Sequence, residues 1–135
     1  MLEYVFVYGT LRRNEANHAF MDGAELVADR AHVFGQMWDT GLGYPALVLA
    51  GRSKVYGELY RVSPAQLRRL DELEGYVGPG GPNEYERVEE TVYAEGRCLR
   101  AYVYVYTQPP AAGVRLTSGD WTAERGRSPN GEAGE

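Results

Sequence analysis

The chain has 135 residues, a formal net charge of −5 and a single cysteine, Cys98. A single cysteine cannot form an internal disulfide. The arginines are scattered through an acidic chain, which argues against non-specific nucleic-acid binding. The apolar runs are far shorter than the ~18 residues that a membrane span needs. We therefore expect a cytoplasmic protein without nucleic-acid or membrane partners, with one domain over residues 1–124 and a disordered tail over residues 125–135, which is rich in Gly, Ser, Pro and Glu.

The first predicted element is a strand over residues 4–8, in which aromatic residues alternate with valines. Gly9 and Thr10 end this strand, and the loose helical spacing of apolar residues over residues 11–21 predicts a short helix. Glycine lets the backbone approach a ligand, and free N–H groups at a helix start attract a carboxylate or an oxyanion. The same pattern is also common in purely structural turns.

The middle of the chain predicts short strands around one loop. Alternating and β-branched residues place these strands at residues 24–28, 31–38, 46–50 and 55–62. The loop lies at residues 39–45, where Gly-Leu-Gly-Tyr-Pro contains three turn-forming residues.

A helix is predicted over residues 64–74, with recognisable residues at both ends. Ser63 is a good N-cap, Pro64 suits the first helical position, and Gln66 completes a capping box. Gly75 can adopt the left-handed conformation that ends a helix.

The acid of greatest interest in this helix is Glu74, which falls on the apolar stripe one turn after Leu70 and two turns after Leu67. A carboxylate in that position loses water and meets the negative end of the helix dipole, so both effects raise its pKa. A carboxyl with a pKa near neutrality is suited to proton transfer. Alternatively, a residue in the last turn simply points to solvent. We assign structural roles to Asp71 and Glu72.

A mobile loop is expected at residues 78–82, which are all glycine or proline. Strands at residues 84–93 and 97–106, with a turn near Glu95 and Gly96, predict a hairpin. Six or seven short strands and one clear helix predict an α+β fold, a small mixed β-barrel with short flanking helices packed outside or across one mouth.

Signals for several other chemistries are lacking. His18 and His32 have no metal-ligand spacing, and the sequence has neither a Walker or Rossmann glycine pattern nor a Gly-x-Ser-x-Gly nucleophile elbow. We therefore expect no metal and no cofactor.

Several short motifs follow one another along the chain: VFVYGTLR at residues 5–12, GYPA at 43–46, VYGELY at 55–60, LDELEGY at 70–76, YER at 85–87, AYVY at 101–104 and SGDW at 118–121. Together they resemble the motifs of the γ-glutamylcyclotransferase-like proteins, a family that includes γ-glutamylamine cyclotransferases and bacterial antibiotic-biosynthesis homologues. The last motif is similar to that of the bacterial branch.

The resemblance implies a compact barrel with a pocket for a γ-glutamyl group. In the family reaction, the substrate's α-amine attacks its own γ-carbonyl, which forms 5-oxoproline and expels an amine or amino acid. Glu74 matches the family's catalytic glutamate. The residues that match the family's substrate-cradling loop are Tyr8, Gly9, Thr10 and Leu11. Tyr106, or another tyrosine of its strand, is a candidate for orienting the substrate.

Two hypotheses stay open at this point. The first is a metal-independent γ-glutamyl cyclotransferase, of the lyase or acyltransferase type, in which Glu74 takes a proton from the α-ammonium and returns it to the leaving nitrogen. The second is a member of the same fold that binds a small ligand or a protein partner without turnover. In either case the protein is expected to be a monomer or a homodimer. The loop at residues 77–83 is a candidate lid.

Overall fold

The computed structural model describes residues 3–126. Its elements in chain order are β1 (Glu3–Val7), the 3-10 helix η1 (His18–Met21), β2 (Glu25–Phe34), β3 (Gln36–Asp39), β4 (Pro45–Val48), β5 (Lys54–Val62), α1 (Pro64–Glu74), β6 (Glu86–Ala94), β7 (Arg97–Val105), β8 (Val114–Arg115) and α2 (Trp121–Gly126). The tail expected to be disordered lies outside the described residues, except for residues 125 and 126, which belong to α2.

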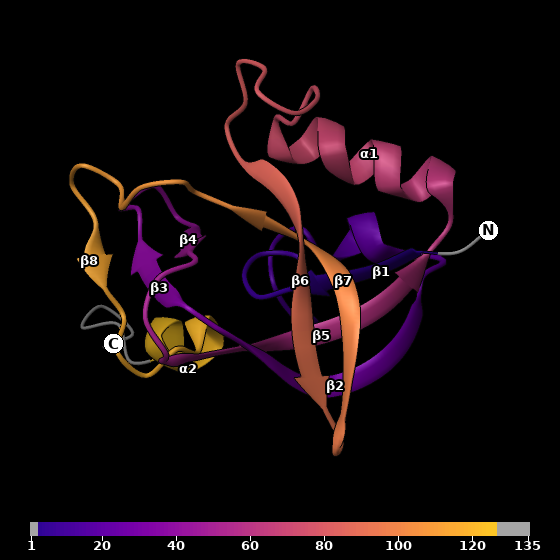
Figure 1. Cartoon of the computed structure of the whole chain (residues 1–135), viewed down its shortest axis with the longest axis horizontal. Coiled ribbons are helices and arrows are strands. Elements are labelled where there is room, and N and C mark those ends of the chain that lie inside the picture. Colours follow the sequence, from indigo (N-terminus) through magenta and orange to yellow (C-terminus); the bar gives the residue numbers. More distant parts are fainter. Residues whose placement is uncertain (1–2, 127–135) are drawn as a thin grey trace.

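Five strands close into a barrel in the order β1-β5-β2-β6-β7 (Figure 1). β1 and β7 pair in parallel, while the other barrel neighbours pair antiparallel. A second sheet, in the order β4-β3-β8, lies at one side of the barrel. The predicted α+β barrel is therefore confirmed, but within residues 3–126 the barrel has five strands, and three more strands form the separate sheet.

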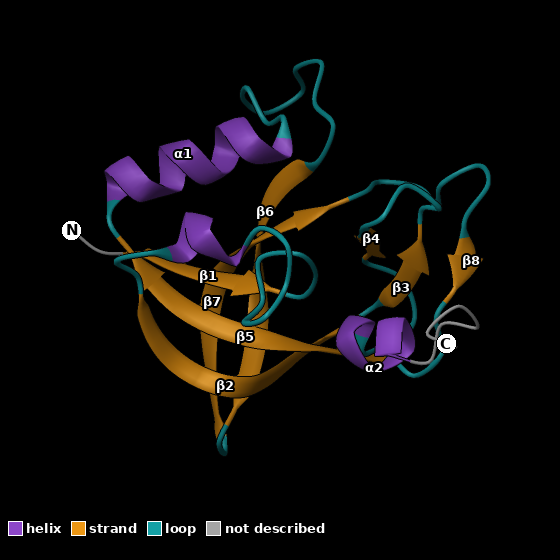
Figure 2. Ribbon diagram, turned by 180° about the vertical axis from the view of Figure 1, so that it is seen from behind, coloured by secondary structure: helices purple, strands orange, loops and turns teal. Residues whose placement is uncertain are grey.

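Alternation along the barrel strands divides the apolar side chains between two cores. In β1, Phe6 lies in the core that fills the barrel, whereas Val5 lies in the core beneath α1. In β7 the same alternation puts Val103 in the barrel and Tyr104 beneath α1. Figure 2 shows α1 and η1 together on this side of the barrel, so the second core attaches the helix to β1 and β7.

Helix α1 has the predicted bounds and the predicted ends. The Ser63 hydroxyl accepts a hydrogen bond from the Gln66 N–H at 3.1 Å, and Gly75 ends the helix at φ 69° and ψ 33°. The capping box itself is incomplete, because the Gln66 amide donates instead to the carbonyl oxygens of Phe20 and Asp22. These two carbonyls belong to the end of η1, so Gln66 joins the two helices rather than closing a cap.

Asp71 connects α1 to the barrel. Its carboxylate accepts hydrogen bonds from the Arg87 guanidinium at 2.6 Å and from the Tyr104 hydroxyl at 2.7 Å. The Arg87 guanidinium also lies over the rings of Tyr76 and Tyr102. Asp71 therefore has the structural role expected of it, since it holds the C-terminal half of α1 against β6 and β7.

The predicted helix over residues 11–21 is wrong for most of its length, since only η1 is helical. The residues before η1 form successive turns, in which the Arg12 N–H donates to Gly9 O and the Glu15 N–H donates to Arg12 O, both at 3.0 Å. Asn14, inside the second of these turns, has a φ of 68°. That left-handed residue interrupts a right-handed helix, and asparagine tolerates the conformation better than most residues do.

The strands predicted at residues 24–28 and 31–38 are divided differently in the structure. β2 continues through residues 29 and 30 with shifts of register on both sides of Ala28, and the break falls at Gly35. A Cβ added to Gly35 would lie 2.8 Å from the Val48 carbonyl oxygen, so the close passage of β4 requires glycine there. The β6–β7 hairpin is as predicted, with Glu95 and Gly96 at φ 52° and 77° in its turn.

Candidate active site

A cavity of about 290 Å³ opens beside the C-terminal end of α1. Its walls come from the end of β1 and the loop that follows, the start of β4, the last turn of α1, the segment before β6, and β7. Glu74 and the predicted loop residues Tyr8, Gly9, Thr10 and Leu11 all line this one cavity. The structure thus brings together two segments that lie more than sixty residues apart in the sequence.

Glu74 is half-buried in the cavity wall, and within residues 3–126 no group donates a hydrogen bond to its carboxylate. Burial, together with the nearby negative charge of Glu84, raises the pKa of Glu74 to about 7. The carboxyl group can therefore both accept and release a proton near neutral pH.

The backbone on either side of loop 77–83 fixes Glu84 relative to Glu74. The Glu84 N–H donates to Gly75 O at 2.9 Å, and the Tyr85 N–H donates to Glu74 O at 3.3 Å. A Cβ added to Gly75 would lie 2.7 Å from the Glu84 Cβ, so glycine at this helix end also makes room for Glu84. The loop between them contributes no residue to the cavity lining, and its role as a lid stays a hypothesis.

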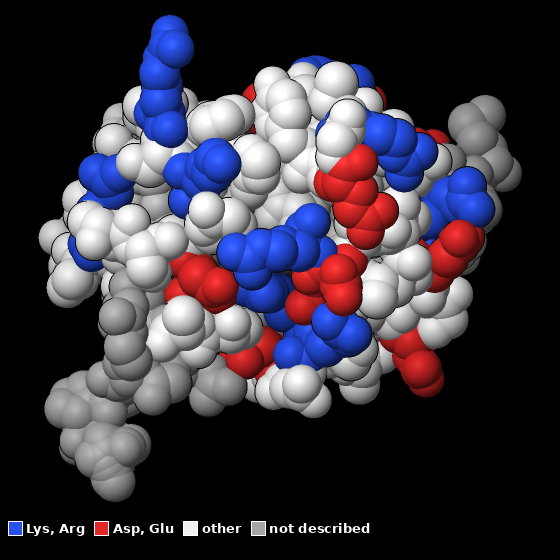
Figure 3. Space-filling model, turned by 90° about the horizontal axis from the view of Figure 1, so that it is seen from below, with Lys and Arg blue, Asp and Glu red and all other residues white. Residues whose placement is uncertain are grey.

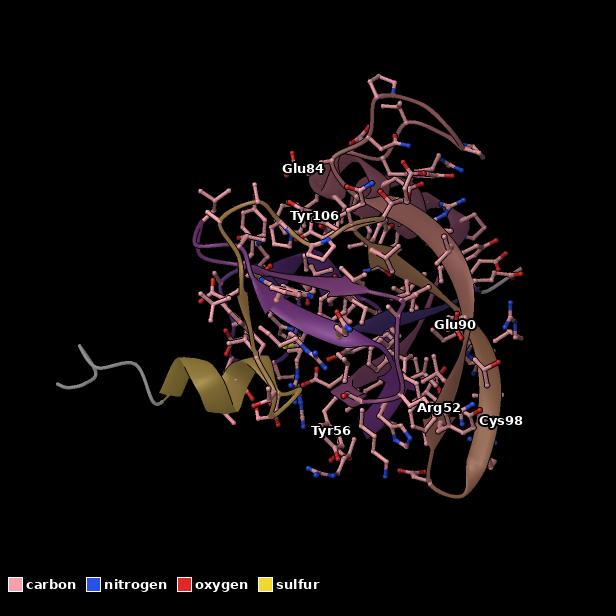
Figure 4. The ribbon with its side chains drawn as sticks, turned by 60° about the vertical axis from the view of Figure 1, so that its left-hand side comes forward. Arg52, Tyr56, Glu84, Glu90, Cys98 and Tyr106 are labelled. Atoms are coloured by element: carbon pink, nitrogen blue, oxygen red, sulfur yellow. The ribbon has the colours of Figure 1, made fainter. Side chains whose placement is uncertain are left out.

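The Glu84 side chain stands at the mouth of the cavity and is exposed to solvent. Its Oε2 accepts hydrogen bonds from the hydroxyls of Tyr44 at 3.3 Å and Tyr106 at 3.2 Å. Figure 4 shows Glu84 and Tyr106 next to each other. Tyr106 itself does not line the cavity, so the structure places this predicted substrate residue at its rim, in contact with Glu84 and with the ring of Tyr85 at 4.9 Å.

Two tyrosines shape the cavity wall, but their hydroxyl groups are already occupied. The Tyr8 hydroxyl donates to Tyr104 O at 2.7 Å and accepts from the Leu47 N–H at 3.0 Å. The Tyr85 hydroxyl donates to Pro45 O at 2.7 Å. Burial raises the pKa of both tyrosines, which keeps them protonated. Tyr8 therefore lines the site with its ring, while its hydroxyl joins β1 to β4 and β7.

The loop after β1 carries amide groups that are free to bind a ligand. Among residues 3–126, no acceptor is hydrogen bonded to the N–H groups of Gly9, Thr10 and Leu11. Asn17 holds the loop by donating from its backbone to Thr10 O at 2.8 Å and from its side chain to Thr10 Oγ1 at 3.0 Å. A Cβ added to Gly9 would lie 2.6 Å from the Pro45 ring, so close contact with the protein, rather than with a ligand, already requires glycine here.

The same loop is fixed from below by Glu58, a buried carboxylate of β5. Glu58 accepts hydrogen bonds from the Arg12 side chain at 3.3 Å, the Arg13 N–H at 3.1 Å and the Tyr60 hydroxyl at 2.9 Å. Arg12 also pairs with Asp120 at 3.0 Å, and this pair links the loop to the segment before α2.

On the face in Figure 3, positive and negative side chains are interspersed across the centre.

Comparison with known proteins shows the family to which the chain belongs. A family model described as gamma-glutamyl cyclotransferase, AIG2-like, matches residues 5–123. The chain belongs to this family. Membership accounts for the motifs that meet in the cavity, since the glycine loop after β1 and the end of α1 are both within the matched residues.

Two curated relatives show how similar this chain is to other members of the family. The gamma-L-glutamyl-butirosin B gamma-glutamyl cyclotransferase of Niallia circulans is 42% identical over 122 residues, which cover 90% of this chain and 76% of the relative. The gamma-glutamylcyclotransferase family protein YtfP of Escherichia coli K12 is 38% identical over 119 residues, which cover 87% and 94% of the two chains. The family and these relatives indicate γ-glutamylcyclotransferase activity.

Solved structures of the family share the fold. An AIG2-like protein from Mus musculus superposes with a TM-score of 0.65 at 28% identity, over 81% of this chain and 80% of that one. The solution structure of E. coli YtfP gives a TM-score of 0.62 at 32% identity, over 90% and 98%. Within residues 3–126, no helix of this chain has the length and apolar character needed to cross a membrane.

Sequence reasoning missed two residues of the cavity lining, Glu84 and Tyr44, and one residue that supports its glycine loop, Glu58. Glu84 carried no local signal, because it reaches the cavity only through the backbone bonds that close the loop before it. Tyr44 did stand in a recognised motif, but its hydrogen bond spans forty residues. Glu58 did have a signal, since an acid within an otherwise apolar strand predicts a buried partner, here Arg12.

Proposed function

We propose that the protein is a γ-glutamyl cyclotransferase, which converts a γ-glutamyl amine or peptide into 5-oxoproline and a free amine, with Glu74 as general acid and base. The observation that carries the proposal is the position of Glu74. It has no hydrogen-bond donor among residues 3–126, has a pKa of about 7, and shares its cavity with the free N–H groups of Gly9, Thr10 and Leu11.

The first step is a proton transfer followed by ring closure. The substrate's α-ammonium gives a proton to the Glu74 carboxylate, and the freed α-nitrogen attacks the γ-carbonyl carbon. The raised pKa of Glu74, about 7, lies closer to that of an ammonium group than the pKa of an ordinary carboxyl does, so the free-energy cost of the transfer is reduced. The nucleophile and the carbonyl belong to one molecule, and the enzyme has only to hold them in the folded geometry.

The second step breaks the bond to the leaving nitrogen. While the carbonyl oxygen is negatively charged, the N–H groups of residues 9–11 supply hydrogen bonds to it, as in other oxyanion sites. Glu74, now protonated, gives its proton to the leaving nitrogen, and the carbon–nitrogen bond breaks. The new ring nitrogen still carries two protons, and it gives one of them to the released amine, so the products are neutral 5-oxoproline lactam and an ammonium ion. One carboxyl thus ends the cycle in its starting state, and neither step requires a metal or a cofactor.

A panel of γ-glutamyl amines and γ-glutamyl dipeptides, with 5-oxoproline measured by chromatography, tests the proposal. Wild-type protein should release 5-oxoproline together with an equal amount of amine. If no compound is turned over while one or more of them raises the melting temperature, the protein binds γ-glutamyl ligands without catalysis, and the proposal is wrong.

A further inference from the structure

The charges around the cavity point to a particular class of substrate. Glu74 and Glu84 are the two charged residues of its lining within residues 3–126, where no lysine, arginine or histidine contributes. The nearby arginine of the glycine loop, Arg12, is engaged by Glu58 and Asp120. A bound molecule therefore meets two carboxylates and no positive side chain, an arrangement that favours a cation.

The two carboxylates lie at different depths. Glu74 is half-buried and shares the cavity with the amide groups that are proposed to bind the reacting carbonyl, whereas Glu84 is exposed to solvent. When the γ-glutamyl group lies with its α-amine at Glu74, the leaving group extends toward solvent, which is also the direction in which it departs. Glu84 is thus placed beside the leaving group rather than beside the α-amine.

The Glu84 carboxylate is held in a way that leaves one oxygen available. The hydroxyls of Tyr44 and Tyr106 both donate to Oε2, and no described group donates to Oε1. The ring of Tyr85 contacts the rings of both tyrosines, at centroid distances of 6.2 Å and 4.9 Å. A carboxylate oxygen beside aromatic rings suits an ammonium group, which forms a charged hydrogen bond to the oxygen and interacts with the ring faces.

We infer that Glu84, held by Tyr44 and Tyr106, is a specificity-determining residue that recognises a positively charged amino group on the leaving group. The preferred substrates are then γ-glutamyl conjugates of diamines or of other amines that carry a second amino group. This inference rests on the proposed function, because it assigns the solvent side of the cavity to the leaving group.

Two substrates of equal size test the inference. γ-Glutamyl-1,4-diaminobutane ends in an ammonium group at the position where γ-glutamyl-n-pentylamide has a methyl group. Wild-type protein should prefer the diamine conjugate about tenfold in kcat/KM, the size expected for one partly exposed charge pair with aromatic neighbours. Glu84→Gln should bring the ratio of the two kcat/KM values close to one.

The ratio separates recognition of the leaving group from other effects of the substitution. If Glu84 instead held the α-ammonium, or acted only through the pKa of Glu74, Glu84→Gln would change both substrates equally and leave the ratio unaltered. Glu72→Gln is the matched control, since it removes the same charge from an exposed residue of α1 outside the cavity and should keep the wild-type ratio. An unchanged ratio in Glu84→Gln, or equal rates for both substrates in wild type, overturns the inference.

Binding measurements keep the inference testable apart from turnover. Calorimetry with the Glu74→Gln variant compares the dissociation constants of the two conjugates without relying on catalysis. Tighter binding of the diamine conjugate, lost when Glu84→Gln is added, supports the cation subsite even if no 5-oxoproline is ever formed, in which case the proposed function alone fails. Equal binding of the two conjugates contradicts the subsite, whatever the outcome for turnover.

Discussion

Glu84 N–H is hydrogen bonded to the carbonyl oxygen of Gly75, the residue directly after Glu74, so the two glutamates are fixed at the two ends of one closed loop. Glu74 gains the proximity of a second negative charge through this bond, and its pKa is raised for that reason as well as by burial. The closed loop therefore brings the two glutamates to one cavity without lining it.

The pH dependence of activity should report this relationship. Because a base must be ionised to accept a proton, kcat/KM should fall as the pH decreases through about 7, the pKa of Glu74. Glu84→Gln removes a negative neighbour, so the pKa of Glu74 falls and the acidic limb of the profile moves to lower pH. Profiles measured with a neutral leaving group isolate this effect, and Glu72→Gln should leave the limb in place. An identical limb in Glu84→Gln would show that Glu84 does not act on Glu74.

Glu74 should decrease the stability of the fold above neutral pH. Its pKa is about 7 in the folded protein and 4.5 ordinarily, so between these values the folded state binds more protons than the unfolded state. The free energy of unfolding then falls as the pH rises through that window. At pH 8, Glu74→Gln should be more stable than wild type by about 1–3 kcal/mol, with little difference at pH 4.

Urea unfolding of both proteins at the two pH values measures this difference. A variant that is equally stable at pH 8 would mean that the ionised carboxylate is well solvated. The role of Glu74 as a base with a raised pKa would then be untenable.

Glu58 should support the glycine loop rather than take part in chemistry. Glu58→Gln leaves Arg12 and Arg13 without the buried carboxylate that holds them, which should lower the free energy of unfolding by about 2–4 kcal/mol. Displacement of the loop should lower kcat/KM as well, while the acidic limb of the pH profile stays at its wild-type position. A shift of that limb would instead indicate that Glu58 affects the titration of the base.

Gly9 is expected to tolerate no larger residue while Pro45 is present. Gly9→Ala places a Cβ within 2.7 Å of two atoms of the Pro45 ring, and such overpacking costs about 1–3 kcal/mol. Adding Pro45→Ala removes those ring atoms and should recover part of the stability and of the activity. A double-mutant cycle in thermal unfolding measures the coupling. Simple additivity of the two substitutions would exclude this contact as the reason for glycine.

The sequence was informative where one element contains the whole signal. The caps and leucine spacing of residues 64–74 predict α1 with its bounds, and the same spacing directs Glu74 toward the core. The hairpin turn at Glu95 and Gly96 is equally local. Alternation along a strand predicts which side chains share a face, and several such strands predict a barrel. The order of the strands in the barrel does not follow from alternation.

Features that depend on several segments could not be predicted in this way. Gln66 satisfies the capping pattern, yet its side chain bonds to carbonyls more than forty residues away. The helix expected after Gly9 fails because of the left-handed Asn14, since the spacing of apolar residues gives no information on φ. Glu84 enters the site only when the loop before it closes, so its role becomes visible in the structure alone.

The rate of 5-oxoproline release by Glu74→Gln, compared with wild type under saturating γ-glutamyl substrate, tests the central claim most directly. The substitution keeps the size of the side chain and removes its ability to exchange a proton. We expect kcat to fall by about 10²–10⁴-fold, while the substrate still raises the melting temperature of the variant. Release at the wild-type rate would contradict the assignment of Glu74 as the acid and base of the reaction.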